Sequence, residues 1–173
     1  ARSNDGVVYD KSSEQTAHIK SDHFTGYTFT IQGYDNEGSL VGKNNPANKI
    51  TSITEEMSQD AFRTTAVNQW GFLPNTLRKN GTTIANNNYQ PAPKTTPTEI
   101  DKTTSPNKAD GGKDYKLAIG ARIDNTMSLD SYGQTFILAA TGNGYDYHIG
   151  FTDNMTSLPD DIYGHEDTAS VNL

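Results

Sequence analysis

The chain has 173 residues, of which 32% are hydrophobic, it contains no cysteine, and its formal net charge is -7. This length suits one domain, and the lack of cysteine excludes disulfides and thiol chemistry. Nucleic acids and anionic lipids bind clustered Lys and Arg, and the sequence has no such cluster, so neither is an expected partner. No apolar run reaches about 18 residues, so the sequence predicts no membrane span.

Most apolar residues alternate with polar ones, which is typical of strands, and the abundant Thr and Tyr fit a pleated surface. The pattern is clearest over residues 27–32, 114–123 and 135–140. We expect further strands at residues 15–20, 40–41, 49–53, 69–72, 98–101, 145–151 and 168–173. Short strands separated by turn-forming residues predict an all-β, antiparallel β-sandwich of about seven to nine strands with at most one short helix.

Local patterns predict how some of these segments are arranged. Ser52 and Glu55 have the spacing of a capping box, so we expect the helix within residues 52–67. Residues 124–132 form a polar connection of hairpin length, which predicts that strands 114–123 and 135–140 pair antiparallel. Within residues 114–123, Leu117 and Ile119 should face the core, and Ala118, Gly120 and Arg122 should form the wetter face.

The same alternation predicts one hydrophobic core. Its expected members are Tyr27, Phe29, Ile31, Trp70, Leu117, Ile119, Phe136 and Leu138. Trp70 is the only tryptophan, and both a core anchor and a sugar-stacking platform are conceivable for it. We expect the core position.

No residue pattern indicates catalysis. No two of the four histidines have the i, i+4 spacing of a helical metal pair, and no G-x-S-x-G elbow occurs. The adjacent carboxylates Glu55-Glu56 and Asp160-Asp161 are interpreted as solvated or helix-terminal acids. We therefore predict no catalytic residue, no metal site and no cofactor, and we expect that the protein is not an enzyme.

Several short motifs follow one another in a characteristic order. They are Thr25 to Ile31, Asn68 to Phe72, Tyr89 to Pro93, Thr103 to Pro106, and Tyr115 to Asp124 followed by Leu129 to Phe136. In this order, residues 18–143 resemble an immunoglobulin-like (Ig-like) domain of large surface proteins of Gram-positive and related bacteria, including adhesins and WxL-type cell-wall proteins. The resemblance implies an Ig-like sandwich on the cell surface with structural or adhesive work. Asp130 stands where that family usually has Gly, and Asp tolerates the left-handed conformation expected there.

The resemblance divides the chain into three parts. Residues 1–17 form an N-terminal extension, residues 18–143 the Ig-like core, and residues 144–173 a C-terminal segment with six acidic residues and no Lys or Arg. Either end could donate a strand to a neighbouring subunit. The candidate donor residues are Val7, Val8 and Tyr9 at one end, and Ala169, Val171 and Leu173 at the other.

These observations lead to two functional hypotheses. The first is an extracellular structural protein, a subunit or module of a bacterial surface filament, pilus or surface layer, which forms a head-to-tail homopolymer by β-strand complementation. The alternative is an adhesin or carbohydrate-binding module with a host or cell-surface glycan or protein as partner. That alternative would use loop aromatics such as Tyr34, Tyr89, Tyr145 and Tyr147.

Overall fold

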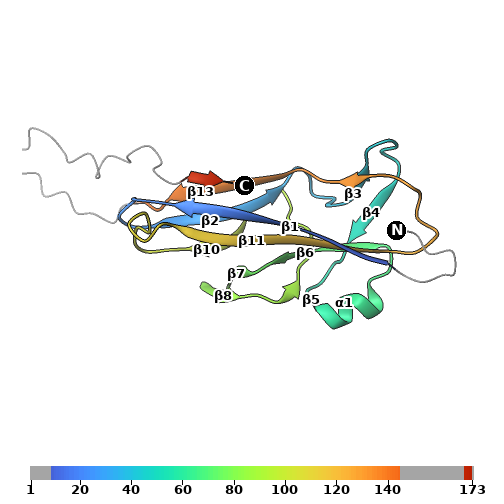
Figure 1. The fold of residues 1–173 in the computed structure, drawn as a ribbon, viewed down its shortest axis with the longest axis horizontal. Helices are drawn as coiled ribbons and strands as arrows, with labels where there is room; N and C mark the ends of the chain where they lie inside the picture. Colours follow the sequence, from blue (N-terminus) through green and yellow to red (C-terminus); the bar gives the residue numbers. More distant parts are fainter. Residues whose placement is uncertain (1–8, 145–169, 173) are drawn as a thin grey trace, which may run out of the picture.

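The computed structural model describes residues 9–144 and 170–172, with two packed β-sheets and a smaller layer beside them (Figure 1). The larger sheet orders its strands as β12 (Tyr132–Gly133), β3 (Leu40–Gly42), β4 (Lys49–Ser52), β6 (Gln69–Pro74), β11 (Lys113–Ile123), β1 (Tyr9–Lys20) and β14 (Ser170–Asn172). The opposing sheet has the order β10 (Thr98–Lys102), β2 (Tyr27–Gly33) and β13 (Phe136–Gly142).

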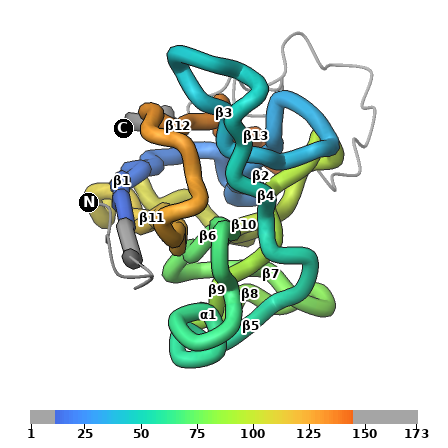
Figure 2. Tube along the Cα trace, turned by 90° about the vertical axis from the view of Figure 1, so that its right-hand side faces the viewer, coloured from blue at the N-terminus to red at the C-terminus, as the bar shows by residue number. Residues whose placement is uncertain are grey.

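The smaller layer lies on the side of the larger sheet away from β2 and β13, as the two views show (Figures 1 and 2). It contains the pair β5 (Met57–Ser58) and β9 (Asn88–Tyr89), the pair β7 (Thr76–Lys79) and β8 (Thr82–Ala85), and the helix α1 (Gln59–Thr65). Parts of the larger sheet are thus covered on both faces.

The predicted all-β sandwich with a single short helix is confirmed over the described residues. The described strands number fourteen, more than expected, because several contain only two to four residues. The pairing is also not wholly antiparallel, since β4 runs parallel to β6 with Thr51 opposite Gln69. No described helix has the length and apolar character needed to cross a membrane.

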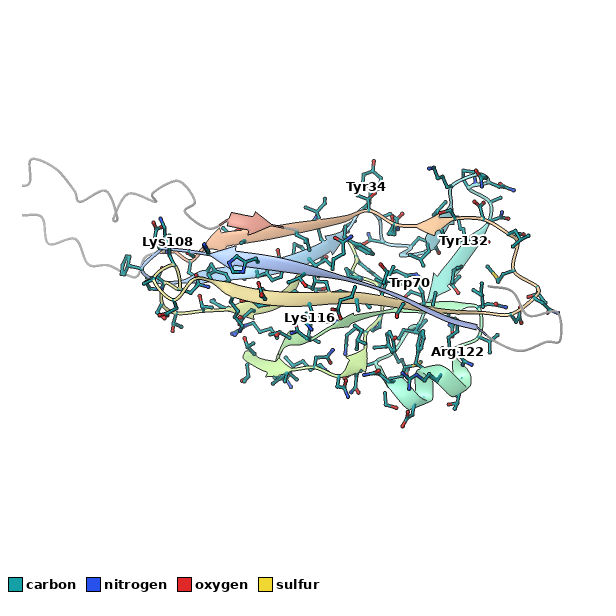
Figure 3. The ribbon with its side chains drawn as sticks, in the orientation of Figure 1. Tyr34, Trp70, Lys108, Lys116, Arg122 and Tyr132 are labelled. Carbon is teal, nitrogen blue, oxygen red and sulfur yellow. The ribbon has the colours of Figure 1, made fainter. Side chains whose placement is uncertain are left out.

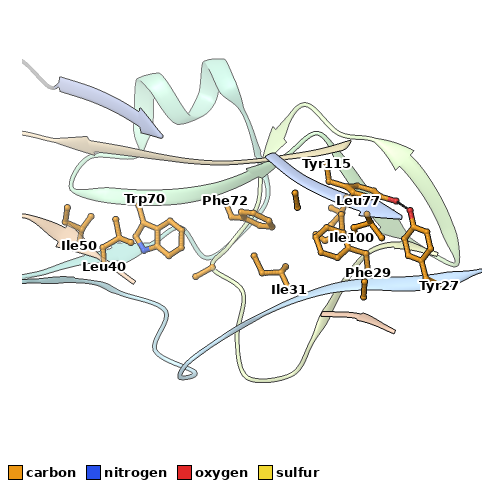
Figure 4. Packing of buried hydrophobic residues seen from close by; sticks show 14 residues of the cluster. Tyr27, Phe29, Ile31, Leu40, Ile50, Trp70, Phe72, Leu77, Ile100 and Tyr115 are labelled. Atoms are coloured by element: carbon orange, nitrogen blue, oxygen red, sulfur yellow. Dashed lines mark hydrogen bonds between the residues drawn. The ribbon is translucent and has the colours of Figure 1, made fainter. Parts of the chain in front are cut away.

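The core is a band of apolar side chains between the two sheets (Figure 4). Tyr27, Phe29, Ile31 and Trp70 are at most 2% exposed. The other predicted core residues pack against this cluster but are only partly buried: Leu117, Ile119, Phe136 and Leu138. All eight predicted residues therefore meet in one cluster, and Trp70 is a core anchor.

The expected hairpin between residues 114–123 and 135–140 is wrong. β11 pairs with β1 and β6 in the larger sheet, whereas β13 pairs with β2 in the opposing sheet. The connecting residues are held at the end of the sandwich, because the Asp124 N–H donates to Asn68 Oδ1 (2.9 Å) and β12 pairs with β3. The polar connection therefore carries the chain from one sheet to the other.

The helix is shorter than expected and begins at a different cap. Its N-cap is Ser58, whose hydroxyl accepts from the Ala61 N–H (3.1 Å), while Ser52 lies in β4. Glu55, the expected partner of Ser52, lies before the helix begins. The capping box proposed at Ser52 is therefore wrong, because the β4–β6 ladder takes up that residue.

The face of β11 that was expected to be more solvent-exposed is buried over most of its length. Ala118, Gly120 and Arg122 are all buried, because the smaller layer covers them. Gly120 lies opposite Gly71 on β6, and a Cβ added to Gly120 would lie 2.3 Å from the Tyr89 hydroxyl. Tyr89 thus rests on this glycine pair and excludes water from it.

The terminal segments join the larger sheet where the structure describes them. β1 begins at Tyr9, opposite Ile123, so residues 9–17 belong to the sheet and not to an extension. Val171 lies opposite Ile19 at the far end of β1. The remaining candidate donor residues lie outside the described residues: Val7, Val8, Ala169 and Leu173.

The position of Trp70 leads to a prediction about stability. Trp70→Ala should lower the free energy of unfolding by about 3 to 5 kcal/mol, because it leaves a large cavity in the core. It also removes the hydrogen bond from Trp70 Nε1 to the Gly38 carbonyl (2.9 Å). Urea unfolding followed by circular dichroism measures the change. Tyr34→Ala is the control, since Tyr34 is 74% exposed and should change stability by less than about 0.5 kcal/mol. A Trp70→Ala variant as stable as the parent would contradict the core position of Trp70.

Candidate functional site

A groove runs along the inward faces of β1 and β11. Its opposite wall is formed in one part by β2 and β13 of the opposing sheet, and in the other part by β3, β4 and β12 at the far edge of the larger sheet. It consists of two cavities of about 280 and 470 Å³, and both are lined by Ser13 and Ile119. The lining of the two cavities is mostly apolar: Ile31, Leu40, Ile50, Phe72, Leu117, Ile119, Ala121, Ile123, Tyr132, Phe136 and Leu138. We call this feature the inter-sheet groove.

The inward face of β1 shows where the groove opens. Side chains at every second position point the same way, so Ile19, Ala17, Gln15 and Ser13 share this face. Ile19 and Ala17 are fully buried, whereas Gln15 and Ser13 are exposed and line the groove. The buried positions lie at or next to the stretch from His18 to Lys20, where β14 pairs with β1. The groove is therefore closed at the β14 end and open toward Tyr9.

The inward face of β11 shows the same incomplete cover. Tyr115, near β14, is fully buried, but the following inward residues from Leu117 to Ile123 are only partly buried. On β13, Ala140 is buried while Leu138 and Phe136 are partly exposed. A sandwich of this size normally buries such residues, so this part of the core lacks a covering element among the described residues.

Two strand edges border the groove. Among the described residues, β1 pairs only with β11 from Tyr9 to Ala17, and β13 pairs only with β2. The other edge of each strand therefore has no strand partner in the described part of the chain. Open edges present main-chain donors and acceptors that can bind a further strand.

Asp130 fixes the loop at the open end of the groove. Its carboxylate accepts from the backbone N–H groups of Asn44 (3.0 Å), Asn45 (3.0 Å) and Ser131 (2.8 Å), and from Asn48 Nδ2 (3.2 Å). These hydrogen bonds, above all that from Asn44, lower the pKa of Asp130 to about 2. The left-handed conformation expected at Asp130 is not found, since its φ is not positive. The carboxylate instead binds the neighbouring loop at residues 44–48.

A buried polar cluster ties the sheets together near the closed end. Tyr115 donates to Asp101 Oδ2 (2.5 Å), and its hydroxyl also lies 2.5 Å from that of Tyr27. Lys113 forms an ion pair with the same Asp101 oxygen (2.9 Å). Burial alone would raise the pKa of Asp101, but the hydrogen bonds from Tyr115, Lys113 and Thr83 outweigh it and lower the pKa. Because Asp101 lies on β10 and Tyr115 on β11, the cluster links the two sheets.

Burial and the bond to Asp101 raise the pKa of Tyr115, so its hydroxyl stays protonated and acts as a donor. Tyr27 is likewise buried, and its pKa is raised. Each of these groups is satisfied by protein partners on other strands or, for Tyr27, also by Asn107 in the loop before β11. The arrangement can hold the sheets in register.

The predicted ligand-binding residues are not brought together. Tyr89 is buried against Phe62, with ring centroids 4.0 Å apart, whereas Tyr34 projects from the opposite side of the molecule (Figure 3). Tyr145 and Tyr147 lie outside the described residues. Within the described ranges, no group of three His, Asp or Glu side chains could hold a metal ion.

Much of the groove leaves no clear pattern in the sequence. Ser13, Gln15 and Gln134 are polar and do not stand out among core residues, and Leu40, Ile50 and Tyr132 lie on strands too short to show a period. A signal was present on β1, where Ile19 and Ala17 are followed at the same spacing by Gln15 and Ser13. That change from apolar to polar marks where the strand loses its cover.

Comparisons with known proteins found no matching family model, no matching curated protein and no matching solved structure. A function can therefore be inferred only from the molecule itself, above all from the groove and its two open strand edges.

The hydrogen bonds of Asp130 predict a dependence on acid pH. An unfolded Asp titrates near pH 3.8 and the folded residue at about 2, so the stabilisation is complete above about pH 4 and is lost as the pH falls through 2. The amide resonances of Asn44 and Asn45 should therefore titrate with a midpoint near pH 2 in an NMR experiment. Asp130→Asn should remove this titration. A midpoint near pH 4 in the parent would contradict the assigned hydrogen bonds.

Proposed function

We propose that this chain is an extracellular structural protein, a subunit of a bacterial surface filament or surface layer whose copies associate by β-strand complementation. The observation that carries the proposal is the inter-sheet groove, which is apolar and bordered by two open strand edges. A strand from a neighbouring copy would bind in this groove. No catalytic residue is assigned.

Strand addition uses both features of the groove, its open strand edges and its apolar lining. The main chain of an added strand can hydrogen-bond to the open edge of β1 or β13, which gives affinity without a particular sequence. Its alternate side chains point inward, where they can bury the partly exposed faces of residues such as Leu117, Ile119 and Leu138. Each Å² of apolar surface removed from water contributes about 25 cal/mol. A donor with large apolar side chains at every second position is therefore favoured.

The two ends of the groove differ, which favours a polymer with direction. β14 covers one end and the other is open, so a donor enters from the open end. A contact between a donor segment on one copy and a groove on the next is heterologous, and repetition of such a contact gives rings or open filaments. The bacterial surface location rests on the resemblance of residues 18–143 to Ig-like surface domains.

The alternative of a glycan-binding module has less support. Trp70 and Tyr89 are buried, and Tyr34 does not join another predicted loop aromatic in the described part of the chain. A flat or concave aromatic surface, which such a module needs, is not assembled from these residues.

Self-association should depend on the groove face of β1. Ser13→Arg places a long cation in the groove, where a bound strand would bury it without a partner. We expect it to raise the concentration needed for association by about tenfold or more. Sedimentation velocity and negative-stain microscopy measure the association of the full chain.

Thr16→Arg is the matched control, because Thr16 is exposed on the opposite face of β1. It should associate like the parent, and both variants should melt within a few degrees of it. A parent that stays monomeric at high concentration would contradict the proposal, as would equal association of the two variants. Saturable binding on a glycan array by the monomer would support the adhesin instead.

A further inference from the structure

We infer that the strand bound in the inter-sheet groove is the segment of residues 145–151 from a second copy of this chain. The inference rests on the proposed function and names the donor. The segment reads Tyr-Asp-Tyr-His-Ile-Gly-Phe and follows β13 after the two residues Asn143 and Gly144.

The sequence of this segment has the pattern that the groove requires. Tyr145, Tyr147, Ile149 and Phe151 occur at every second position, so in a strand they share one face. The opposite face carries the polar or small residues Asp146, His148 and Gly150. One face can enter the groove while the other stays in water.

The length of the segment also matches. Seven residues in a strand span about 23 Å. The inward residues of β11 that are only partly buried run from Leu117 to Ile123, which is also seven residues with four inward positions. Four apolar donor side chains thus meet four apolar positions of the acceptor strand.

The same chain cannot readily place this segment in its own groove. β14 lies close to both β1 and β13 at the end where β13 finishes, so that entrance is occupied (Figure 1). Asn143, just before the segment, is fixed by its backbone N–H to the Gly26 carbonyl (3.0 Å) and by its amide to Thr103 O (2.7 Å). Its φ is not positive, whereas a tight Asn-Gly hairpin turn needs a positive φ at both residues. The open end of the groove is at the opposite end of the sandwich.

The N-terminal residues are weaker donors. In residues 1–8 the only large apolar side chains are Val7 and Val8, which are adjacent and so fall on opposite faces of a strand. Tyr9 already belongs to β1, and Val171 to β14.

The chain can reach a neighbour and return. Residues 152–169 join the donor segment to β14, and eighteen residues can span up to about 60 Å. This exceeds the length of the groove more than twofold. A donor can therefore sit in the next copy while β14 stays paired with β1 of its own copy.

Substitutions in the full chain test the donor. Ile149→Asn should raise the concentration needed for association by about tenfold or more, because it removes one apolar side chain from the groove. His148→Asn is the matched control on the opposite face and should stay within about twofold of the parent. Melting temperatures of both should equal that of the parent, which excludes unfolding as the cause.

The outcomes separate this inference from the proposed function. If Ser13→Arg blocks association and Ile149→Asn does not, the groove binds a strand but residues 145–151 are not that strand. If the parent does not associate, the proposed function itself fails.

Cysteine cross-linking can show whether the donor segment comes from the same copy or from a second copy. The parent has no cysteine, so every disulfide formed involves the introduced residues. Gln15→Cys on the groove face of β1 and Ile149→Cys form the test pair. A mixture of the two single variants should give a disulfide-linked dimer under mild oxidation, whereas Thr16→Cys in place of Gln15→Cys should give much less. The double variant, oxidised at high dilution, should stay free of an internal cross-link. An internal cross-link with no dimer from the mixture would overturn the assignment to a second copy.

Discussion

Tyr89 lies on the paired glycines Gly71 and Gly120, and this close approach determines how the rest of the molecule is layered. Any side chain at either glycine would collide with the ring, so the smaller layer can approach the larger sheet only because both positions lack a Cβ. Phe62 stacks on the other side of Tyr89, and Arg122 donates to the Phe62 carbonyl (2.9 Å). The outer face of β11 is therefore buried from Ala118 to Arg122, although its residues there are small or charged.

The inner face of the same strand is less completely buried. Its large apolar residues point into the sandwich, but the three strands that the opposing sheet has among the described residues do not cover them fully. β14 supplies cover at one end only. The larger sheet is thus covered more completely on its polar face than on part of its apolar face, which is the physical basis of the strand-acceptor proposal.

The ends of the groove are held by polar interactions of different kinds. At the closed end, Asp101 and Tyr115 join β10 to β11 through buried hydrogen bonds, which need fixed partners because an unsatisfied group there would be costly. At the open end, Asp130 binds the N–H groups of a surface loop. The walls of the groove are therefore fixed before any strand binds, which lowers the ordering cost of association.

Alternation is a local property of a strand, so the sequence alone predicts the strands with a clear period of two and the eight proposed core residues, which all lie in or against the core cluster. The single short helix of the described residues is also expected from the sequence. The Asn-Gly pair in the turn of the β7–β8 hairpin is a local signal of the same kind, since Asn80 (φ 50°) and Gly81 (φ 77°) take the left-handed conformations that such a turn needs. Strand pairing depends on the tertiary structure. β11 and β13 lie in different sheets although just the short β12 separates them in sequence, since Asp124 and Asp130 hold their connection across the end of the sandwich. Likewise Ser58, not Ser52, caps the helix, because Ser52 is taken into the β4–β6 ladder. The groove follows from where cover is missing on both sheets at once, and no local pattern in one strand records what its neighbours leave uncovered.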